Sequence, residues 1–212
     1  MIKIKYYPLL FLLILTGCAT QSLVKNSSPF LKQSIISRNQ QLSNLINWEI
    51  SGKIAFIQTD TDKRESAAIN WRYQEPTAHK AMQQRLDLTT ILGINVLHLT
   101  SQDNYHQIKI DGKSYHGEKL DELIGALTGL ALPTQALTAW LKGLPYSKSD
   151  SIQYNEITNL PSTLTSQYND KTWQINYAKY QAVENHQLAT KLTIKQNDLT
   201  IRIVIKRWSI NK

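Results

Sequence analysis

The most reactive side chains in this sequence are one cysteine, Cys18, and five histidines. The histidines show neither an HExxH pair nor any other metal-ligand spacing; they are His79, His98, His106, His116 and His186. Three of them, at 98, 106 and 116, could approach one another across neighbouring strands, although isolated surface imidazoles are the commoner case. No GxSxG segment supplies a nucleophilic serine. We therefore predict no catalytic residue, no metal site and no cofactor, and a protein that is not an enzyme.

Cys18 follows a segment that reads as an export signal. Lys3 and Lys5 precede the short apolar run 8–15, which is well under the roughly 20 residues that a membrane-spanning helix needs. One alternative is an ordinary secreted protein with a free thiol, which is a liability in an oxidising compartment. The segment Leu15-Thr16-Gly17-Cys18, however, resembles the lipobox of bacterial lipoproteins. In those proteins the cysteine becomes the first residue of the mature chain and carries lipid on its sulfur and its amino group.

The lipobox resemblance implies a division of the chain into three parts. These are a lipoprotein signal peptide at 1–17, a lipidated N-terminus with a flexible tether at 18–30, and a folded domain at 31–212. Removal of the signal leaves 195 of the 212 residues, enough for one domain with a sizeable core. In enteric bacteria an aspartate after the cysteine marks retention in the inner membrane. Ala19 stands there, which implies anchoring through Cys18 in the periplasm-facing leaflet of the outer membrane.

The charge balance favours an anionic partner. Lysine and arginine total 24 against 16 acidic residues, and loss of two lysines with the signal leaves a net charge of +6. Such a surplus favours contact with lipid headgroups or with an acidic partner protein, while a solvated surface without a partner is the alternative. The basic residues are scattered along the sequence without a stripe, so we expect no binding to nucleic acid.

Most of the chain alternates apolar and polar residues with a period of two, the pattern of half-buried strands. Segment 48–56 places Trp48, Ile50, Gly52, Ile54 and Phe56 on one face. The alternation recurs in seven further segments: 67–73, 86–90, 96–100, 105–110, 173–177, 192–194 and 199–205. Short polar turns such as Asp111-Gly112 join neighbouring strands, which makes them antiparallel.

Two segments in the middle of the chain have helical spacing instead. Segment 118–129 ends at Gly129, and a second segment after Pro133 ends at Gly143, both suited to a helix C-terminus. About ten strands must curl or be covered to hide one face. The predicted fold is therefore mainly β: a curved antiparallel sheet forming an incomplete, half-open β-barrel of about 10–11 strands with a helical lid.

A half-barrel of this kind can hold an apolar ligand on its concave face. The candidate lining comes from the first strands and from the inner faces of the two helices. Its residues are Trp48, Ile50, Ile54, Phe56, Ile69, Trp71, Leu120, Leu123, Leu127, Leu137 and Trp140. A packed core made of the same residues is the alternative.

One turn is unexpectedly apolar. A hairpin turn exposed to water should be polar, but here the chain presents Ile91, Leu92, Gly93 and Ile94. These residues could dip into the leaflet of a membrane, where one leucine gains about 1.5–3 kcal/mol. That suffices for insertion but not for attachment. Alternatively, the hairpin folds back against its own core.

Three segments in order resemble the LolB family of outer-membrane lipoprotein receptors. They are WEISGKIAF at 48–56, ELIGALTGLALP at 122–133 and AWLKGLP at 139–145. The family has the half-barrel fold with a helical lid and a protruding loop ending in Leu-Gly, whose leucine is needed for insertion. Leu92-Gly93 matches that pair, whereas Thr90-Ile91 replaces the Asn-Pro commonly found before it.

The resemblance implies a receptor that accepts lipoproteins from a periplasmic LolA-like carrier and inserts them into the inner leaflet of the outer membrane. The expected partners are that carrier, the acyl chains of the cargo and outer-membrane phospholipid, and we expect a monomer. The alternative function is a structural or assembly lipoprotein of the outer membrane that binds protein without transferring lipid.

Overall fold

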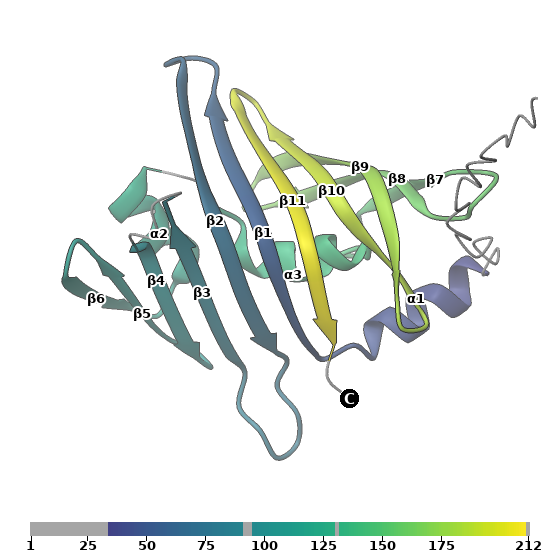
Figure 1. Cartoon of the computed structure of the whole chain (residues 1–212), viewed down its shortest axis with the longest axis horizontal. Helices are drawn as coiled ribbons and strands as arrows, with labels where there is room; N and C mark the ends of the chain where they lie inside the picture. The colour runs from purple at the N-terminus through teal and green to yellow at the C-terminus, as the bar shows by residue number, and fades with distance from the viewer. Residues whose placement is uncertain (1–33, 91–94, 130–131, 211–212) are drawn as a thin grey trace, which may run out of the picture. The chain divides into compact units, whose positions relative to one another are not determined.

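A computed structural model describes residues 34–90, 95–129 and 132–210, all within the unit Leu31–Lys212. Within this part of the chain, eleven strands form one antiparallel sheet in the order β6-β5-β4-β3-β2-β1-β11-β10-β9-β8-β7 (Figure 1). The strands are β1 (Asn47–Gln58), β2 (Lys63–Gln74), β3 (Gln83–Thr89), β4 (Asn95–Gln102), β5 (Tyr105–Ile110), β6 (Lys113–Gly117), β7 (Ser151–Tyr154), β8 (Pro161–Tyr168), β9 (Lys171–Val183), β10 (His186–Gln196) and β11 (Leu199–Ile210).

The order of the strands explains where the helices lie. The chain starts in the middle of the sheet with β1 and proceeds strand by strand to one edge at β6. Helices α2 (Leu120–Thr128) and α3 (Thr134–Lys142) then carry it to the opposite edge, from which β7 to β11 return to pair with β1. The two edge strands β6 and β7 do not pair with each other, so the sheet remains open.

Tight turns fix the register of neighbouring strands. Asp111 and Gly112 both have positive φ, 50° and 75°, and connect β5 to β6 with Ile110 opposite Lys113. Asn169 and Asp170 likewise have φ of 50° and 58° between β8 and β9. Two central residues with positive φ match the right-handed twist of the strands, so these turns select antiparallel hairpins.

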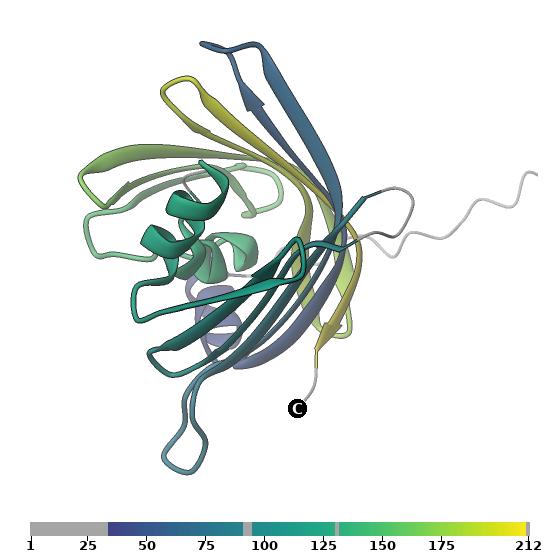
Figure 2. The same ribbon diagram turned by 90° about the vertical axis from the view of Figure 1, so that its left-hand side faces the viewer.

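The sheet curves around one hydrophobic core. Figure 2 shows the strands bending about α2, α3 and the N-terminal helix α1 (Ile35–Ser43), all on the concave side. The inward residues of strands from both halves of the sheet join the helices in a single cluster of buried apolar side chains. The fold predicted from the sequence, a half-open barrel of about 10–11 strands with a helical lid, is thus confirmed.

The sequence reasoning did not identify β7 and β8. In β8 the inward positions are Leu164, Ser166 and Tyr168, and the first and last residues of β7 are Ser151 and Tyr154. Ser166 puts a small hydroxyl side chain at an inward position of β8, and β7 has only 4 residues, so neither segment shows the clear apolar alternation that marks a half-buried strand. Pairing with β9, which does alternate clearly, makes this segment a strand.

Candidate functional site

The eleven residues predicted to line the concave face are brought together by the fold. Nine are buried, and Leu123 and Leu127 on α2 are partly buried and pack against the same core. The other half of the sheet contributes residues that the sequence reasoning had not included in the lining, among them Leu164, Ile175, Leu192, Ile194 and Ile203. The alternating pattern of β9 to β11 was the signal that could have added them. In this conformation the side chains pack against one another, so an acyl-chain lining stays a prediction.

Aromatic rings form a large part of this concave core. The ring of Trp48 lies 5.3 Å from that of Trp71 and 5.7 Å from that of Trp208, measured between centroids. Trp140 on α3 lies 5.8 Å from Trp173 on β9. Among the described residues, the buried indole N–H groups of Trp48 and Trp140 have no hydrogen-bond partner. The apolar interior therefore contains indole hydrogen-bond donors that the other described residues do not use.

Helix α3 is held to the sheet by several polar contacts. Tyr177 donates a hydrogen bond of 2.8 Å to the carbonyl of Trp140. The buried Arg38 of α1 donates to the carbonyls of Lys142 and Gly143 at 2.9 and 3.2 Å, and burial lowers the pKa of Arg38. Its guanidinium supplies donors and positive charge where the helix leaves carbonyls unpaired.

The last residue of α3 adds an ion pair. The ammonium group of Lys142 lies 2.9 Å from a carboxylate oxygen of Glu75 and donates at 3.3 Å to the carbonyl of Leu45. The side chain of Lys142 is 4 % exposed, so its charge requires this partner. Helix α3 is thus fixed at its C-terminal end by contacts from α1, β9 and the segments flanking β1 and β2.

Helix α2 is less firmly held. Only Leu120 and Ile124 of this helix are buried. Its main polar tie is Asp121, which accepts a hydrogen bond of 2.7 Å from the hydroxyl of Tyr168 and one of 3.0 Å from the backbone N–H of Thr134. Burial, followed by this hydrogen bond, raises the pKa of Tyr168. The carboxylate therefore links α2 both to β8 and to the start of α3.

A pocket of about 280 Å³ lies beside this tie. Residues of α2, of the segment before α3 and of the turn between β8 and β9 line it, including Gly125, Leu132, Tyr168 and Trp173. Small-molecule sites typically occupy about 300–1,000 Å³, so the pocket is small for a ligand with several acyl chains. Trp173 also contacts Trp140, which means that the pocket adjoins the concave core.

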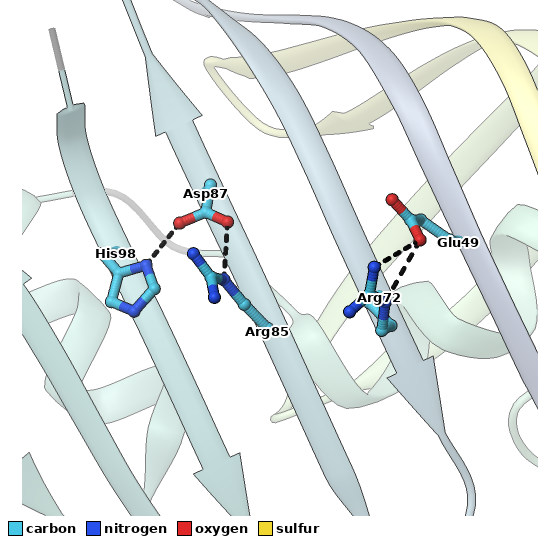
Figure 3. Close-up of polar contacts among 5 residues, drawn as sticks. All are labelled: Glu49, Arg72, Arg85, Asp87 and His98. Carbon is cyan, nitrogen blue, oxygen red and sulfur yellow. Dashed lines mark hydrogen bonds and ion pairs between the residues drawn. The ribbon is translucent and has the colours of Figure 1, made fainter.

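The convex face of the sheet is polar, and five of its charged or titratable side chains on β1 to β4 form pairs (Figure 3). Arg72 contacts Glu49 at 2.9 Å, and Asp87 interacts with both Arg85 and His98. Burial acts to raise the pKa of Asp87, but the hydrogen bonds and charges of His98 and Arg85 outweigh it and lower the pKa. Arg72 and Arg85 are thus neutralised by carboxylates of the same face.

The histidines do not come together. His98 and His116 project from the convex face, where they contact Asp87 and Tyr105, respectively. His106 is buried, and burial lowers its pKa. Across residues 34–90, 95–129 and 132–210, no group of three or more His, Cys, Asp or Glu side chains could hold a metal ion.

The remaining predicted site residues lie outside the described residues. They are Cys18, the proposed lipidation site, and Ile91, Leu92, Gly93 and Ile94, the proposed insertion loop. Of the helices in the described ranges, none is long and apolar enough to cross a membrane.

The fold defines a class of proteins with an open, curved antiparallel sheet and helices over its concave face. A LolA superfamily protein from Nitrosomonas europaea has this fold: it superimposes with a TM-score of 0.55 at 7 % identity, covering 85 % of this chain and 94 % of the other. The family described as "Outer membrane lipoprotein LolB" matches residues 46–208.

Individual relatives agree with the family match. The outer-membrane lipoprotein LolB of Psychromonas ingrahamii is 32 % identical, covering 96 % of this chain and 95 % of its own length. That of Pseudoalteromonas translucida is 28 % identical, covering 95 % and 92 %. The chain belongs to the LolB family of outer-membrane lipoproteins, as the sequence predicted, and this membership confirms that it is not an enzyme.

Proposed function

We propose that this protein accepts lipoproteins from a soluble LolA-like carrier in the periplasm and inserts them into the inner leaflet of the outer membrane. The lipid chains on Cys18 would anchor it there. The observation that carries this proposal is the continuous apolar concave face, which both halves of the sheet build and which α2 and α3 cover. Membership of the LolB family supports the same role.

Covering the cargo is an energetic necessity. A triacylated lipoprotein has on the order of 40 methylenes, and each contributes about 0.8 kcal/mol when removed from water. Release of the free chains into the periplasm would cost about 30 kcal/mol. A receptor must therefore offer an apolar surface to the chains before they leave the carrier.

In the conformation described, that surface is occupied by the protein's own helices. Cargo can enter only if a helix moves, and α2 is the better candidate because fewer of its residues are buried and Asp121 is its main polar tie. Helix α3 would stay, since Arg38 and Tyr177 fix its C-terminal end. The pocket beside Asp121 marks where opening would begin.

The two unpaired indole N–H groups suit a lipid with polar linkages. The chains of a lipidated cysteine join through ester and amide carbonyls, and burying such oxygens without a donor is costly. Trp48 and Trp140 could donate to these carbonyls once the core opens.

Site-specific photo-crosslinking tests the lining. A photoreactive amino acid replaces Leu127, which faces the core, or Ile157, which is 81 % exposed and serves as the matched control. The full-length lipidated protein is mixed with a carrier loaded with cargo that carries labelled acyl chains, without ATP. We expect crosslinks to the label from position 127 and none from 157. Transfer of cargo without any crosslink from position 127 would refute the concave face as the binding surface.

The insertion loop has its own test. Replacing Leu92→Glu should leave acceptance of cargo intact but slow its appearance in the membrane, because a charged tip cannot enter the hydrocarbon region. Ile157→Glu makes the same type of change at an apolar position that is exposed in the structure and should have no effect. Normal insertion by the Leu92→Glu variant would contradict the role of the loop. A protein that takes no cargo from the carrier at all would instead be a structural or assembly lipoprotein.

A further inference from the structure

The basic residues that look scattered in the sequence gather on one part of the convex face. Strands β10 and β11 contain five lysines and arginines and no acidic residue. Together with one lysine of β1 they form what we call the convex basic patch: Lys53, Lys191, Lys195, Arg202, Lys206 and Arg207. All six side chains are exposed, and the three strands are adjacent in the sheet.

The register places these cations on one face of three adjacent strands. Lys53 lies opposite Val204, and Val204 lies opposite Lys191, so the three form one row across the sheet. A bulge in β11 between the partners of Ser51 and Gly52 inserts one extra residue. As a result, Lys206 and Arg207 are both exposed although they are consecutive.

The patch differs from the other half of the same face. On β1 to β4, Arg72 and Arg85 have carboxylate partners. None of the six patch residues forms an ion pair with any other described residue. Like charges directly opposite each other on neighbouring strands destabilise a sheet. Lys191 lies directly opposite the exposed Lys179 of β9, and the fold tolerates this pair without neutralisation. An anion from outside the chain would relieve this repulsion.

We infer that the convex basic patch binds the anionic phospholipid headgroups of the leaflet in which the protein is anchored. Thr193 and Val204 separate the cations, and Val204 is 42 % exposed. Flexible basic side chains around an exposed apolar residue fit a diffuse layer of phosphates. The described ends of β3 and β4, which flank the proposed insertion loop, turn toward this same side of the sheet (Figure 2). This inference rests on the proposed membrane location and adds an orientation to it: the convex side faces the bilayer.

Lysine footprinting of the full-length lipidated protein tests this orientation. The protein is reconstituted in vesicles of phosphatidylcholine alone or of phosphatidylcholine with 30 mol% (about a third) phosphatidylglycerol, a content at which surface attraction becomes strong. The rate of amine labelling is measured at Lys53, Lys191 and Lys195. Lys113 and Lys171 are exposed and lie opposite the inward-facing Ile110 and Tyr168. Residues directly opposite each other share a face, so these two lysines are on the concave side and serve as internal controls.

We expect labelling of the patch lysines to slow by roughly fivefold in the anionic vesicles, which corresponds to the gain of one cation near an anionic surface. The labelling rates of Lys113 and Lys171 should be the same in both kinds of vesicle. High salt should restore the labelling rates of the patch lysines, because it screens their attraction to the headgroups. Equal patch rates in the two kinds of vesicle would overturn the inference. Slowing that arises only after loaded carrier is added would also overturn it, because it assigns the patch to a protein partner.

A charge-reversal pair separates this inference from the proposed function. The variant Lys191→Glu/Lys195→Glu should lose the difference between the two vesicles at Lys53. The variant Lys113→Glu/Lys148→Glu changes two other exposed lysines with the same change of net charge and should keep the difference. Both variants should still take cargo from the carrier in phosphatidylcholine vesicles. Failure of that transfer in the unsubstituted protein would refute the proposed function without bearing on the footprint.

Discussion

The hydrogen bond between Tyr168 and Asp121 is expected to control the mobility of α2. Tyr168→Phe removes the hydroxyl and leaves the ring, so packing is retained. Hydrogen bonds to a charged group contribute about 1.5–3 kcal/mol. Since Asp121 is partly exposed, the lower end of that range applies, and we expect a loss of about 1.5 kcal/mol. For a domain of this size the melting temperature should fall by roughly 3–6 °C.

A double-mutant cycle isolates this interaction. Asp121→Ala also removes the hydrogen bonds from Thr134, so its own effect will be larger than that of Tyr168→Phe. The coupling energy, calculated from the two single variants and the double variant, excludes that extra loss and reports only the interaction between Tyr168 and Asp121. A coupling energy below about 0.5 kcal/mol, the usual scatter for independent sites, would show that the hydrogen bond between Tyr168 and Asp121 does not stabilise the fold.

Hydrogen exchange shows where the structure loosens. In Tyr168→Phe the amides of α2 should exchange faster, while those of α3 should keep their protection because Arg38 and Tyr177 still hold that helix. Tyr177→Phe is the matched control and should affect α3 instead. Cargo acceptance should become faster in Tyr168→Phe only. Equal loss of protection in both helices would show that α2 does not move independently of α3 and does not act as a lid.

Three further predictions concern stability. Gly52→Ala should destabilise the fold by about 1–3 kcal/mol, since a Cβ there would lie 2.1 Å from the carbonyl oxygen of Val204. Gly117→Ala is the control, because the nearest atom to its Cβ would lie at 3.6 Å. Chemical denaturation compares the stability of the two variants. Arg38→Met should cost about 3 kcal/mol in the same assay, because two carbonyls at the end of α3 lose their donor; an unchanged midpoint would contradict the role of the guanidinium. Burial lowers the pKa of His106 below 6.5. The contribution of neutral His106 to stability is therefore complete above pH 6.5 and is lost as the pH falls through the lowered pKa of the folded state. His106→Gln should flatten this part of the stability–pH curve, and a curve identical to that of the unsubstituted protein would exclude His106 as the cause.

Local signals in the sequence predicted a large part of the fold. The pair Asp111-Gly112 specifies a hairpin by its own conformational preferences, and Gly129 and Gly143 end α2 and α3 in the left-handed conformation that favours glycine. The period-two alternation of β1 places Trp48 and Ile50 on the concave face. Each of these features depends on residues close together in the chain.

Features that depend on distant residues could not be predicted in this way. Tyr168 and Asp121 are 47 residues apart, and nothing in either segment indicates the other. The convex basic patch is the clearest case, because its cations come from β1 near the start of the domain and from β10 and β11 at its end. In the sequence they are scattered. Adjacency of β1 and β11 makes them one surface.

That adjacency and the helical lid have a common origin. A chain that builds one half of an open sheet from the centre outward must cross to the other edge before it can build the second half. If it crosses on the concave side, the crossing segment covers the apolar face, as α2 and α3 do here. Helix α2 is joined to the edge strand β6 through residues 118–119 alone, and Asp121 links it to the start of α3. In the proposed function, α2 would tilt away from β8 when the hydrogen bond to Tyr168 breaks. Its connections at both ends would hold it over the opening, which would keep entering acyl chains out of contact with water.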